Sequence, residues 1–189
     1  MRARIQDAAL ACFFRKSFSG TSMADIIKEA GLSAGAVYVY YSSKAELTLD
    51  AGKRIMEERA AELQDFGAAE EVPPPQQVFR QLLDTILHDT PFAPLLLQVW
   101  GEASHSPDFA KVAAEVYEDL IGRFASYLSV YFHRGAGLTE DVAQARANQL
   151  APAVLAVMQG AIVQTAIFGD GSHARITSAV EALLAELVD

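Results

Sequence analysis

The 189-residue chain is poor in the residue types that several common kinds of functional site require. Its single cysteine, Cys12, cannot form a disulfide within the chain, which is typical of a protein from a reducing cytoplasm. The histidines, at positions 88, 105, 133 and 173, are too scattered to suggest the ligand spacing of a metal site. A glycine-rich phosphate loop, a nucleophile elbow and a paired-carboxylate motif are also missing. The sequence therefore predicts a protein that is not an enzyme and has neither a metal site nor a cofactor.

An uninterrupted hydrophobic segment long enough to cross a membrane is missing as well. A membrane-spanning helix needs about 20 predominantly apolar residues. The most apolar run, residues 150–168, contains Gln159, Gln164 and Thr165, and Pro152 lies near its start. We expect this run to form a helix buried among others, in a cytoplasmic protein that does not contact a membrane.

Basic residues are scarce overall, but they are unevenly distributed along the chain. The net charge is -9, which taken alone argues against a nucleic-acid-binding protein. Residues 1–54 contain eight Lys or Arg and five Asp or Glu, a balance of +3, whereas residues 55–189 contain seven and nineteen, a balance of -12. Phosphate binding needs only a local positive face, so this asymmetry is typical of a basic head on an acidic body. An acidic protein whose N-terminus is basic by chance would show the same balance.

Helical periodicity dominates what the sequence does contain. No part of it alternates apolar and polar residues at period two over a useful length, so strands are not expected. Apolar residues recur instead at helical spacing, as in Val78, Leu82, Leu83 and Ile86. Capping residues and helix breakers place helices at about 43–66, after Pro75, from Pro91, from Ser106 to about His133, from Thr139 to Phe168 and from about Ser172. The predicted fold class is all-α.

Residues 21–47 are the most informative part of the chain. Thr21 or Ser22 can cap a first short helix, and Asp25 stands three residues after Ser22, where a capping box places its acidic member. Gly31 follows that helix at the position where a C-terminus favours a residue tolerant of positive φ. These signals predict two short helices joined by a tight turn.

The second short helix opens with side chains small enough for its end to approach another surface closely. Tyrosine hydroxyls and a lysine follow, which is how a helix-turn-helix approaches a DNA groove. The residues that we assign to this DNA-contacting surface, with Lys28 from the preceding helix, are Thr21, Lys28, Ser33, Ala34, Gly35, Ala36, Tyr38, Tyr40 and Lys44.

The same stretch resembles the DNA-binding signature of the TetR family of transcriptional regulators. The matched pattern is Thr-Ser-Met before an Asp-Ile pair, then Ala-Gly-Leu-Ser, a Gly, a Tyr, an aromatic residue, Ser-Lys and Glu-Leu. Upstream, residues 5–10 and Phe13 resemble the first helix of that family. Ser17 stands where the family usually has Gly, Tyr41 where it usually has Phe, and Cys12 where it prefers Leu. We expect these departures to affect packing more than DNA contact.

This resemblance implies a three-helix helix-turn-helix DNA-binding domain at residues 1–47, followed by a helical ligand-binding and dimerisation domain at residues 48–189. In the major groove, Ala34 and Ala36 can contact thymine methyl groups. The tyrosines, Thr21 and Lys44 are candidate phosphate ligands. The second short helix contains no Arg, Asn or Gln, so sequence readout must use apolar contacts, Lys28 and DNA shape. Tyr41, Val37 and Ile26 are expected in the core instead.

The body carries a candidate ligand site. A mostly apolar aromatic set at helical spacing can line a cavity, with Gln98 and His88 among the few polar residues nearby. Such a set is more often ordinary core, but regulators similar to this chain hold small molecules in this region. The set is Phe92, Leu96, Trp100, Tyr117 and Phe124. With the -12 charge of the body, it favours a largely hydrophobic, neutral or cationic effector.

The two C-terminal helices carry a candidate subunit interface. Small residues at positions 151, 153, 156, 160 and 161 make the penultimate helix smooth, which suits either intramolecular core or another subunit. The resemblance implies a homodimer held by these two helices as a four-helix bundle, bound to a palindromic double-stranded DNA operator. We therefore predict a TetR-like regulator, a repressor released by a small hydrophobic ligand. The alternative is an architectural DNA-binding protein without a ligand. The absence of Arg, Asn and Gln from the second short helix is also compatible with this alternative.

Overall fold

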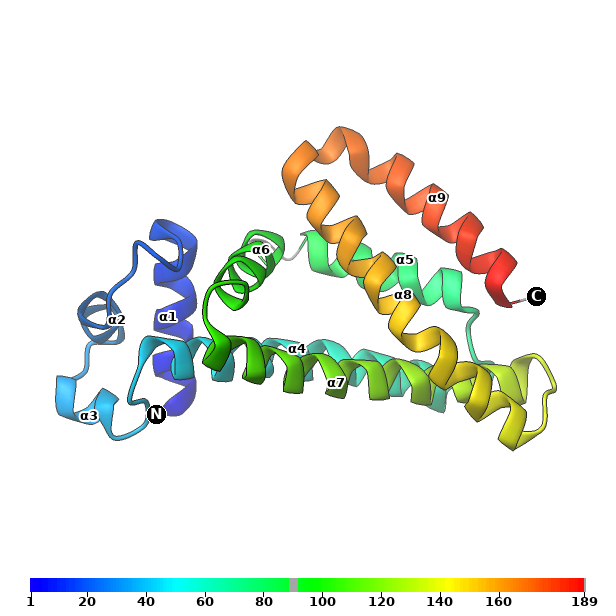
Figure 1. Ribbon diagram of the computed structural model, residues 1–189, viewed down its shortest axis with the longest axis horizontal. Coiled ribbons are helices and arrows are strands. Elements are labelled where there is room, and N and C mark those ends of the chain that lie inside the picture. Colours follow the sequence, from blue (N-terminus) through cyan, green and yellow to red (C-terminus); the bar gives the residue numbers. More distant parts are fainter. Residues whose placement is uncertain (89–91, 189) are drawn as a thin grey trace. The chain divides into compact units, whose positions relative to one another are not determined.

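The computed structural model describes residues 1–88 and 92–188, and none of these residues lies in a β-strand. The prediction of an all-α fold is therefore confirmed (Figure 1). The helices are α1 (Arg2–Lys16), α2 (Met23–Ala30), α3 (Ala34–Tyr38), α4 (Lys44–Ala68), α5 (Pro75–His88), α6 (Phe92–Ala103), α7 (Pro107–Val130), the π-helical turn η1 (Tyr131–Gly135), α8 (Glu140–Phe168) and α9 (Asp170–Val188).

The chain forms two compact units that do not divide at residue 47. The first contains Met1–Glu57 and Pro94–Val116, and the second contains the described parts of Glu58–Ala93 and Tyr117–Asp189. Most of α6 and the start of α7 thus belong to the same unit as the N-terminal helices. The functional boundary between residues 1–47 and 48–189 stays a prediction, because a compact unit and a functional domain need not coincide.

The first unit is organised around α1, whose apolar residues recur at helical spacing and form one buried face. Ile26 from α2 and Val37 from α3 pack against this face and are fully buried, as expected from the sequence. Tyr41 is also fully buried, which confirms its assignment to the core. Phe109 from α7 completes the same core. These contacts set the positions of α2 and α3, the two helices of the helix-turn-helix.

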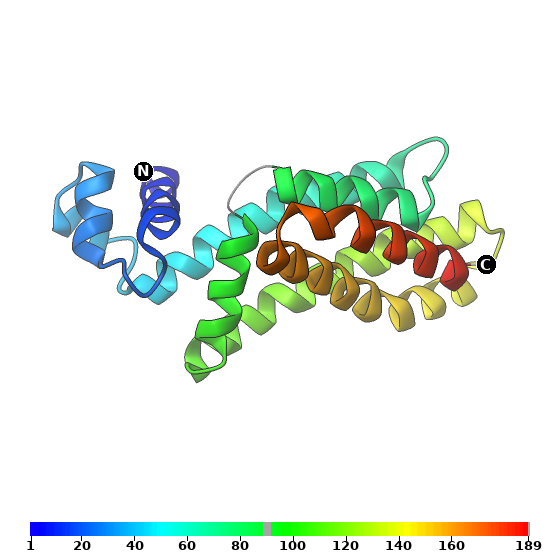
Figure 2. The same cartoon turned by 90° about the horizontal axis from the view of Figure 1, so that it is seen from above.

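The second unit contains α5, α8 and α9, which lie side by side (Figure 2). Their buried residues are mostly aliphatic, and an ion pair between Arg80 of α5 and Glu181 of α9 joins two of the helices at the surface. Arg134 in η1 donates to the carbonyl oxygens of Gly67 and Glu70 and so satisfies backbone acceptors at the end of α4.

The helix boundaries agree with the sequence signals at most ends. Thr139 is the N-cap of α8, as predicted. The last helix begins at Asp170, two residues before the predicted Ser172. By length and composition, α8 is apolar enough to cross a membrane, but helices buried in soluble proteins meet the same criterion, and part of α8 is core here.

Candidate nucleic-acid interface

The start of α2 is fixed by a capping box. Ser22 Oγ accepts a hydrogen bond from Asp25 N at 3.2 Å, and Asp25 Oδ2 accepts one from Ser22 N at 2.9 Å. Asp25 Oδ1 also lies 2.6 Å from Lys16 Nζ on α1. The Lys16 ammonium and the Ser22 donors hold the pKa of the Asp25 carboxyl below its usual value. Of the two predicted cap candidates, Thr21 and Ser22, the structure uses Ser22, and the capping box also joins α1 to α2.

A tight turn then separates α2 from α3. Gly31 adopts φ 61° and ψ 38°, the left-handed conformation that the sequence predicted for this position. Gly31 N donates to Lys28 O at 3.1 Å and Leu32 N donates to Ile27 O at 3.3 Å, which is the hydrogen-bond pattern of a Schellman motif. Leu32 packs against the core at the corner. This geometry sets the angle between the two helices.

The helix α3 presents one face to the core and the opposite face to solvent. Ser33 is its N-cap, and its Oγ accepts from Ala36 N at 3.2 Å. Val37 anchors the helix to the core, whereas Ala34, Gly35 and Ser33 are exposed and Ala36 is half-buried. A Cβ built on Gly35 would meet no atom within 4 Å, so the backbone there is open to a large partner.

Aromatic and apolar side chains continue this exposed surface at the end of α3 and just after it. Tyr38 is 51% exposed and Tyr40 is also exposed, so neither tyrosine is core. Val39, between them, is 81% exposed. Val39 is not among the residues that were predicted from the sequence to contact DNA. The sequence did contain a signal for Val39, because it lies between two tyrosines that were both assigned to the DNA-contacting surface.

Most basic residues of the head hold the head together. Arg4 Nε donates to Ala30 O at 2.7 Å, at the C-terminus of α2 where carbonyl groups lack partners within the helix. Arg15 forms an ion pair with Glu29, and Lys16 with Asp25, so both basic residues join α1 to α2. The Arg15 guanidinium holds the pKa of the Glu29 carboxyl below its usual value. The local positive balance therefore contributes to the stability of the head as well as to its surface charge.

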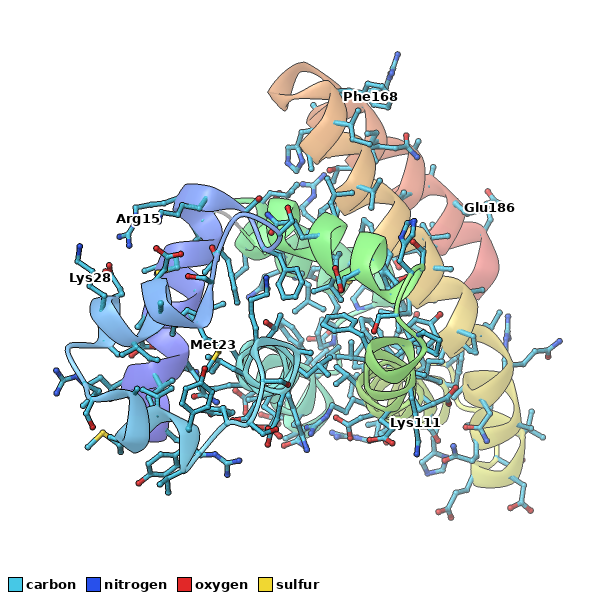
Figure 3. The ribbon with its side chains drawn as sticks, turned by 60° about the vertical axis from the view of Figure 1, so that its left-hand side comes forward. Arg15, Met23, Lys28, Lys111, Phe168 and Glu186 are labelled. Carbon is cyan, nitrogen blue, oxygen red and sulfur yellow. The ribbon has the colours of Figure 1, made fainter. Side chains whose placement is uncertain are left out.

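Lys28 differs from these residues because it is exposed on the last turn of α2. Figure 3 labels it and shows its side chain directed away from the helices. This placement fits the predicted contact with DNA.

Thr21 and Lys44 lie differently from what the sequence suggested. Thr21 is only 2% exposed, and its hydroxyl donates to Ser17 O at 2.7 Å. A contact of Thr21 with a phosphate stays a prediction, but the hydroxyl already has an acceptor within its own loop. Lys44 Nζ donates to Phe18 O at 2.8 Å and to Thr21 O at 2.9 Å. A contact of Lys44 with DNA stays a prediction, but the lysine also stabilises the loop before α2.

Tyr41, at the position where a phenylalanine is usual, uses its hydroxyl in a polar network. The hydroxyl donates to Asp50 Oδ2 at 2.5 Å, and Gln6 Nε2 donates to the same oxygen at 2.8 Å. Burial and the neighbouring carboxylate raise the pKa of Tyr41 to about 12. This network joins α1, α4 and the segment after α3.

The residues predicted to bind a ligand lie on α6 and α7. Leu96 and Trp100 belong to the first compact unit, and Tyr117 and Phe124 belong to the second. Phe124 is buried, and Leu96 and Tyr117 are half-buried. The side chain of Phe92 lies outside the part that the structure describes, as does that of His88. A common cavity lined by this set stays a prediction.

The comparisons with known proteins agree with this geometry. Residues 5–51 match the family described as bacterial regulatory proteins, tetR family. Residues 75–189, more than half of the chain, match the family described as BetI-type transcriptional repressor, C-terminal. The uncharacterized HTH-type transcriptional regulator YfiR of Bacillus subtilis is 46% identical over 46 residues, which are 24% of this chain and 22% of YfiR. The curated relatives are thus matched over less than half of their length, 22% to 41%.

Solved structures are similar to this chain over nearly its whole length. Salmonella enterica GusR has a TM-score of 0.73 at 20% identity, covering 99% of this chain and 94% of GusR. The transcriptional regulator FadR of Bacillus subtilis, solved in complex with stearoyl-CoA, has a TM-score of 0.73 at 13% identity, covering 100% and 98%. At these identities the likeness shows a common fold.

Proposed function

The chain belongs to the TetR family of transcriptional regulators, and from this membership we propose that it is a homodimeric repressor that leaves its operator when a small hydrophobic molecule binds. Members of this family are regulators and not enzymes. The observation that carries the proposal is the exposed end of α3, where Ser33, Ala34 and Gly35 precede the exposed Tyr38 and Tyr40. A helix end of this kind can enter a major groove without steric hindrance.

In the proposed complex, the backbone at Gly35 approaches the DNA, and Ala34 and Ala36 contact the methyl groups of thymines. Val39 adds apolar surface next to them. The hydroxyls of Tyr38 and Tyr40 and the ammonium group of Lys28 bind phosphates and set the register. Sequence preference then comes from methyl contacts and from DNA shape, since α3 has no arginine or amide side chain.

Exposed apolar surface on α8 and α9 supports the proposed dimer. In the most apolar stretch of α8, which is 18 residues long, only 39% is buried within one chain. Ile167 and Phe168 at its end are 60% and 66% exposed, and Leu183 of α9 is exposed as well. A monomeric protein rarely leaves such side chains uncovered together, so a second copy packed on α8 and α9 is the proposed cover. Two heads would then meet two half-sites of a palindrome, about 34–36 Å or a multiple apart.

The proposed ligand is largely hydrophobic and neutral or cationic. The aromatic and aliphatic residues that the sequence selected on α6 and α7 support this chemistry. FadR, which shares the fold, was solved in complex with stearoyl-CoA, whose acyl chain is apolar although its coenzyme A part is anionic. A ligand that binds better to the form unable to bind DNA shifts the population away from the operator, and each 1.4 kcal/mol of differential affinity weakens DNA binding about tenfold.

Selection from a pool of random DNA duplexes tests the DNA-binding part of the proposal. We expect the full chain to enrich a palindromic sequence and to bind it with two chains per duplex, with lower affinity for random duplexes of equal length. Equal affinity for palindromic and random duplexes would favour an architectural DNA-binding protein.

Tryptophan fluorescence tests the proposed release by a ligand. Trp100 is the single tryptophan, so its emission reports on α6 without a label. A compound that releases the selected duplex should change this emission, and Trp100→Ala should weaken its effect. A compound that releases DNA equally well from both proteins without changing the emission would place the ligand elsewhere.

A further inference from the structure

The loop at residues 17–21 connects α1 to the capping box that starts α2, so its conformation sets where the helix-turn-helix begins. Ser17 has φ 65° and ψ 167°, a backbone conformation that residues other than glycine rarely adopt. Such a conformation persists only where surrounding contacts hold it. Besides the packing of the Phe18 ring on Phe13 of α1, the loop is held by contacts with α4, α7 and α6.

The contacts with α4 and α7 converge on Phe18. Lys44 Nζ binds the carbonyl oxygens of Phe18 and Thr21 and lies 4.1 Å from the centroid of the Phe18 ring. The Phe18 ring also packs against Phe109, with centroids 6.0 Å apart. The side chain and the carbonyl group of Phe18 are thus both held, and Phe18 is buried.

The third contact comes from α6. The backbone N–H of Phe18 donates a hydrogen bond to Gln98 Oε1, a residue 80 positions away in the sequence. Gln98 is half-buried, and Val99 beside it packs against the core of the head. From the sequence, Gln98 was expected near a ligand site; in the structure its amide oxygen accepts a hydrogen bond from the loop that precedes α2. An amide side chain within the apolar segment of α6 is the sequence signal for this role.

We propose that Gln98 is a positioning residue that makes the DNA affinity of the head depend on the position of α6. Its oxygen satisfies the Phe18 N–H, which would otherwise be a buried donor without a partner. Movement of α6 breaks this bond, releases the loop and lets the start of α2 shift. Leu96 and Trp100 lie on the same helix as Gln98, so a ligand that shifts α6 would move Gln98 with it. This role rests on the proposed function, because it requires a preferred operator.

Two variants of the full chain separate the hydrogen bond from side-chain packing. Gln98→Met keeps the length of the side chain and removes the acceptor, whereas Gln98→Glu keeps an acceptor oxygen. Amide hydrogen exchange at Phe18 measures the bond itself. We expect at least tenfold faster exchange in Gln98→Met than in wild type, and near wild-type exchange in Gln98→Glu.

Binding of the selected operator duplex measures the consequence. We expect three- to tenfold weaker binding by Gln98→Met and near wild-type binding by Gln98→Glu. Because coupling is reciprocal, saturating operator should also change Trp100 emission in the wild type and in Gln98→Glu but not in Gln98→Met. A residue that only stabilised the head would leave this emission response intact.

The outcomes distinguish this role from the proposed function. If the wild type selects an operator and Gln98→Met matches it in Phe18 exchange, affinity and emission response, the role of Gln98 is wrong and the proposed function stands. If Phe18 exchange accelerates while affinity and emission response remain those of the wild type, the bond exists but does not position the head, which also contradicts the proposal. If the wild type selects no duplex, the proposed function fails and this role fails with it.

Discussion

Tyr38 is half exposed at the end of α3, so its side chain can be removed without leaving a cavity in the core. Tyr38→Ala should weaken binding of the selected operator by about 1–3 kcal/mol, because the proposed phosphate contact and the ring surface are both lost. Tyr38→Phe, which removes only the hydroxyl, should lose less. Fluorescence anisotropy with labelled operator measures both. Wild-type affinity in Tyr38→Ala would exclude this face of α3 from the interface.

Ser17 is the second residue at which a single change is informative. Glycine adopts positive φ without steric cost, so Ser17→Gly should raise the free energy of unfolding by about 1 kcal/mol. The thermal midpoint should rise by about 2–4 °C for a chain of this size. Gly20→Ala is a control that should lower the free energy of unfolding, because a Cβ at Gly20 would lie 2.2 Å from Lys16 O. A Ser17→Gly variant less stable than wild type would mean that the Ser17 hydroxyl stabilises the loop more than its conformation strains it.

At the scale of single elements, α2 depends on its N-terminal cap and on the charge of Asp25. Ser22→Ala removes the hydroxyl that accepts from Asp25 N and should lower the free energy of unfolding by about 1 kcal/mol at neutral pH. Chemical denaturation monitored by circular dichroism measures this loss.

The same cap predicts a dependence on pH. The folded state lowers the pKa of Asp25, so the stabilisation from its carboxylate is complete above the ordinary carboxyl pKa of about 4 and is lost as pH falls through the lowered value. Asp25→Asn should therefore be less stable than wild type at pH 7, and the difference should shrink steadily in the acid range. A difference that stayed constant from pH 7 down to the acid-unfolded state would mean that the charge of Asp25 contributes nothing. Unfolding at a series of pH values gives the answer.

At the scale of the whole molecule, the proposed dimer can be tested at Gly160 on α8. A Cβ at Gly160 would meet no atom of another helix within 4 Å, so the position has room at the start of a side chain, and Gly160→Trp places a large ring on this face of α8. The wild type should sediment at about twice the chain mass of 20.4 kDa. Gly160→Trp should separate the subunits and weaken operator binding, since one head makes half of the contacts.

Gly122→Trp is the matched control for this experiment. Gly122 is exposed on α7, and a Cβ there would also meet no atom within 4 Å, so its variant should keep both the dimer mass and the operator affinity. A wild type that sediments as a monomer at micromolar concentration would contradict the proposed assembly.

Because most basic residues of the head are bound by groups of the head itself, we expect the affinity for DNA to depend only weakly on salt concentration. Five of the eight basic residues in positions 1–54 pair with acidic residues, namely Arg2, Arg15, Lys16, Lys53 and Arg54. Arg4 binds a carbonyl group, and Lys28 and Lys44 are the proposed phosphate cations of each head. Each neutralised phosphate contributes about -0.9 to the slope of log affinity against log salt concentration. Two to four phosphates bound by the dimer should therefore give a slope of about -2 to -4. A slope near -10 would show that the paired arginines are released to bind DNA.

The sequence alone determined the local structure of this protein. The all-α fold class was predicted correctly from the helical periodicity along the chain. The left-handed turn at Gly31 and the cap at Ser33 were also predicted, and the first cap was narrowed to Thr21 or Ser22, because each of these features depends on residues within one helical turn of each other. The burial of Tyr41 was also predicted, since the matched motif places an aromatic core residue there.

Tertiary structure alone decided where the polar side chains act. The burial of Thr21, the use of Lys44 by the loop before α2 and the bond between Gln98 and Phe18 depend on which distant backbone groups lack a partner once the helices have packed. Residue type and spacing do not encode that information. A lysine or an amide at the surface of a helix can bind DNA, a ligand or its own chain, and only the packed arrangement of the helices selects among them.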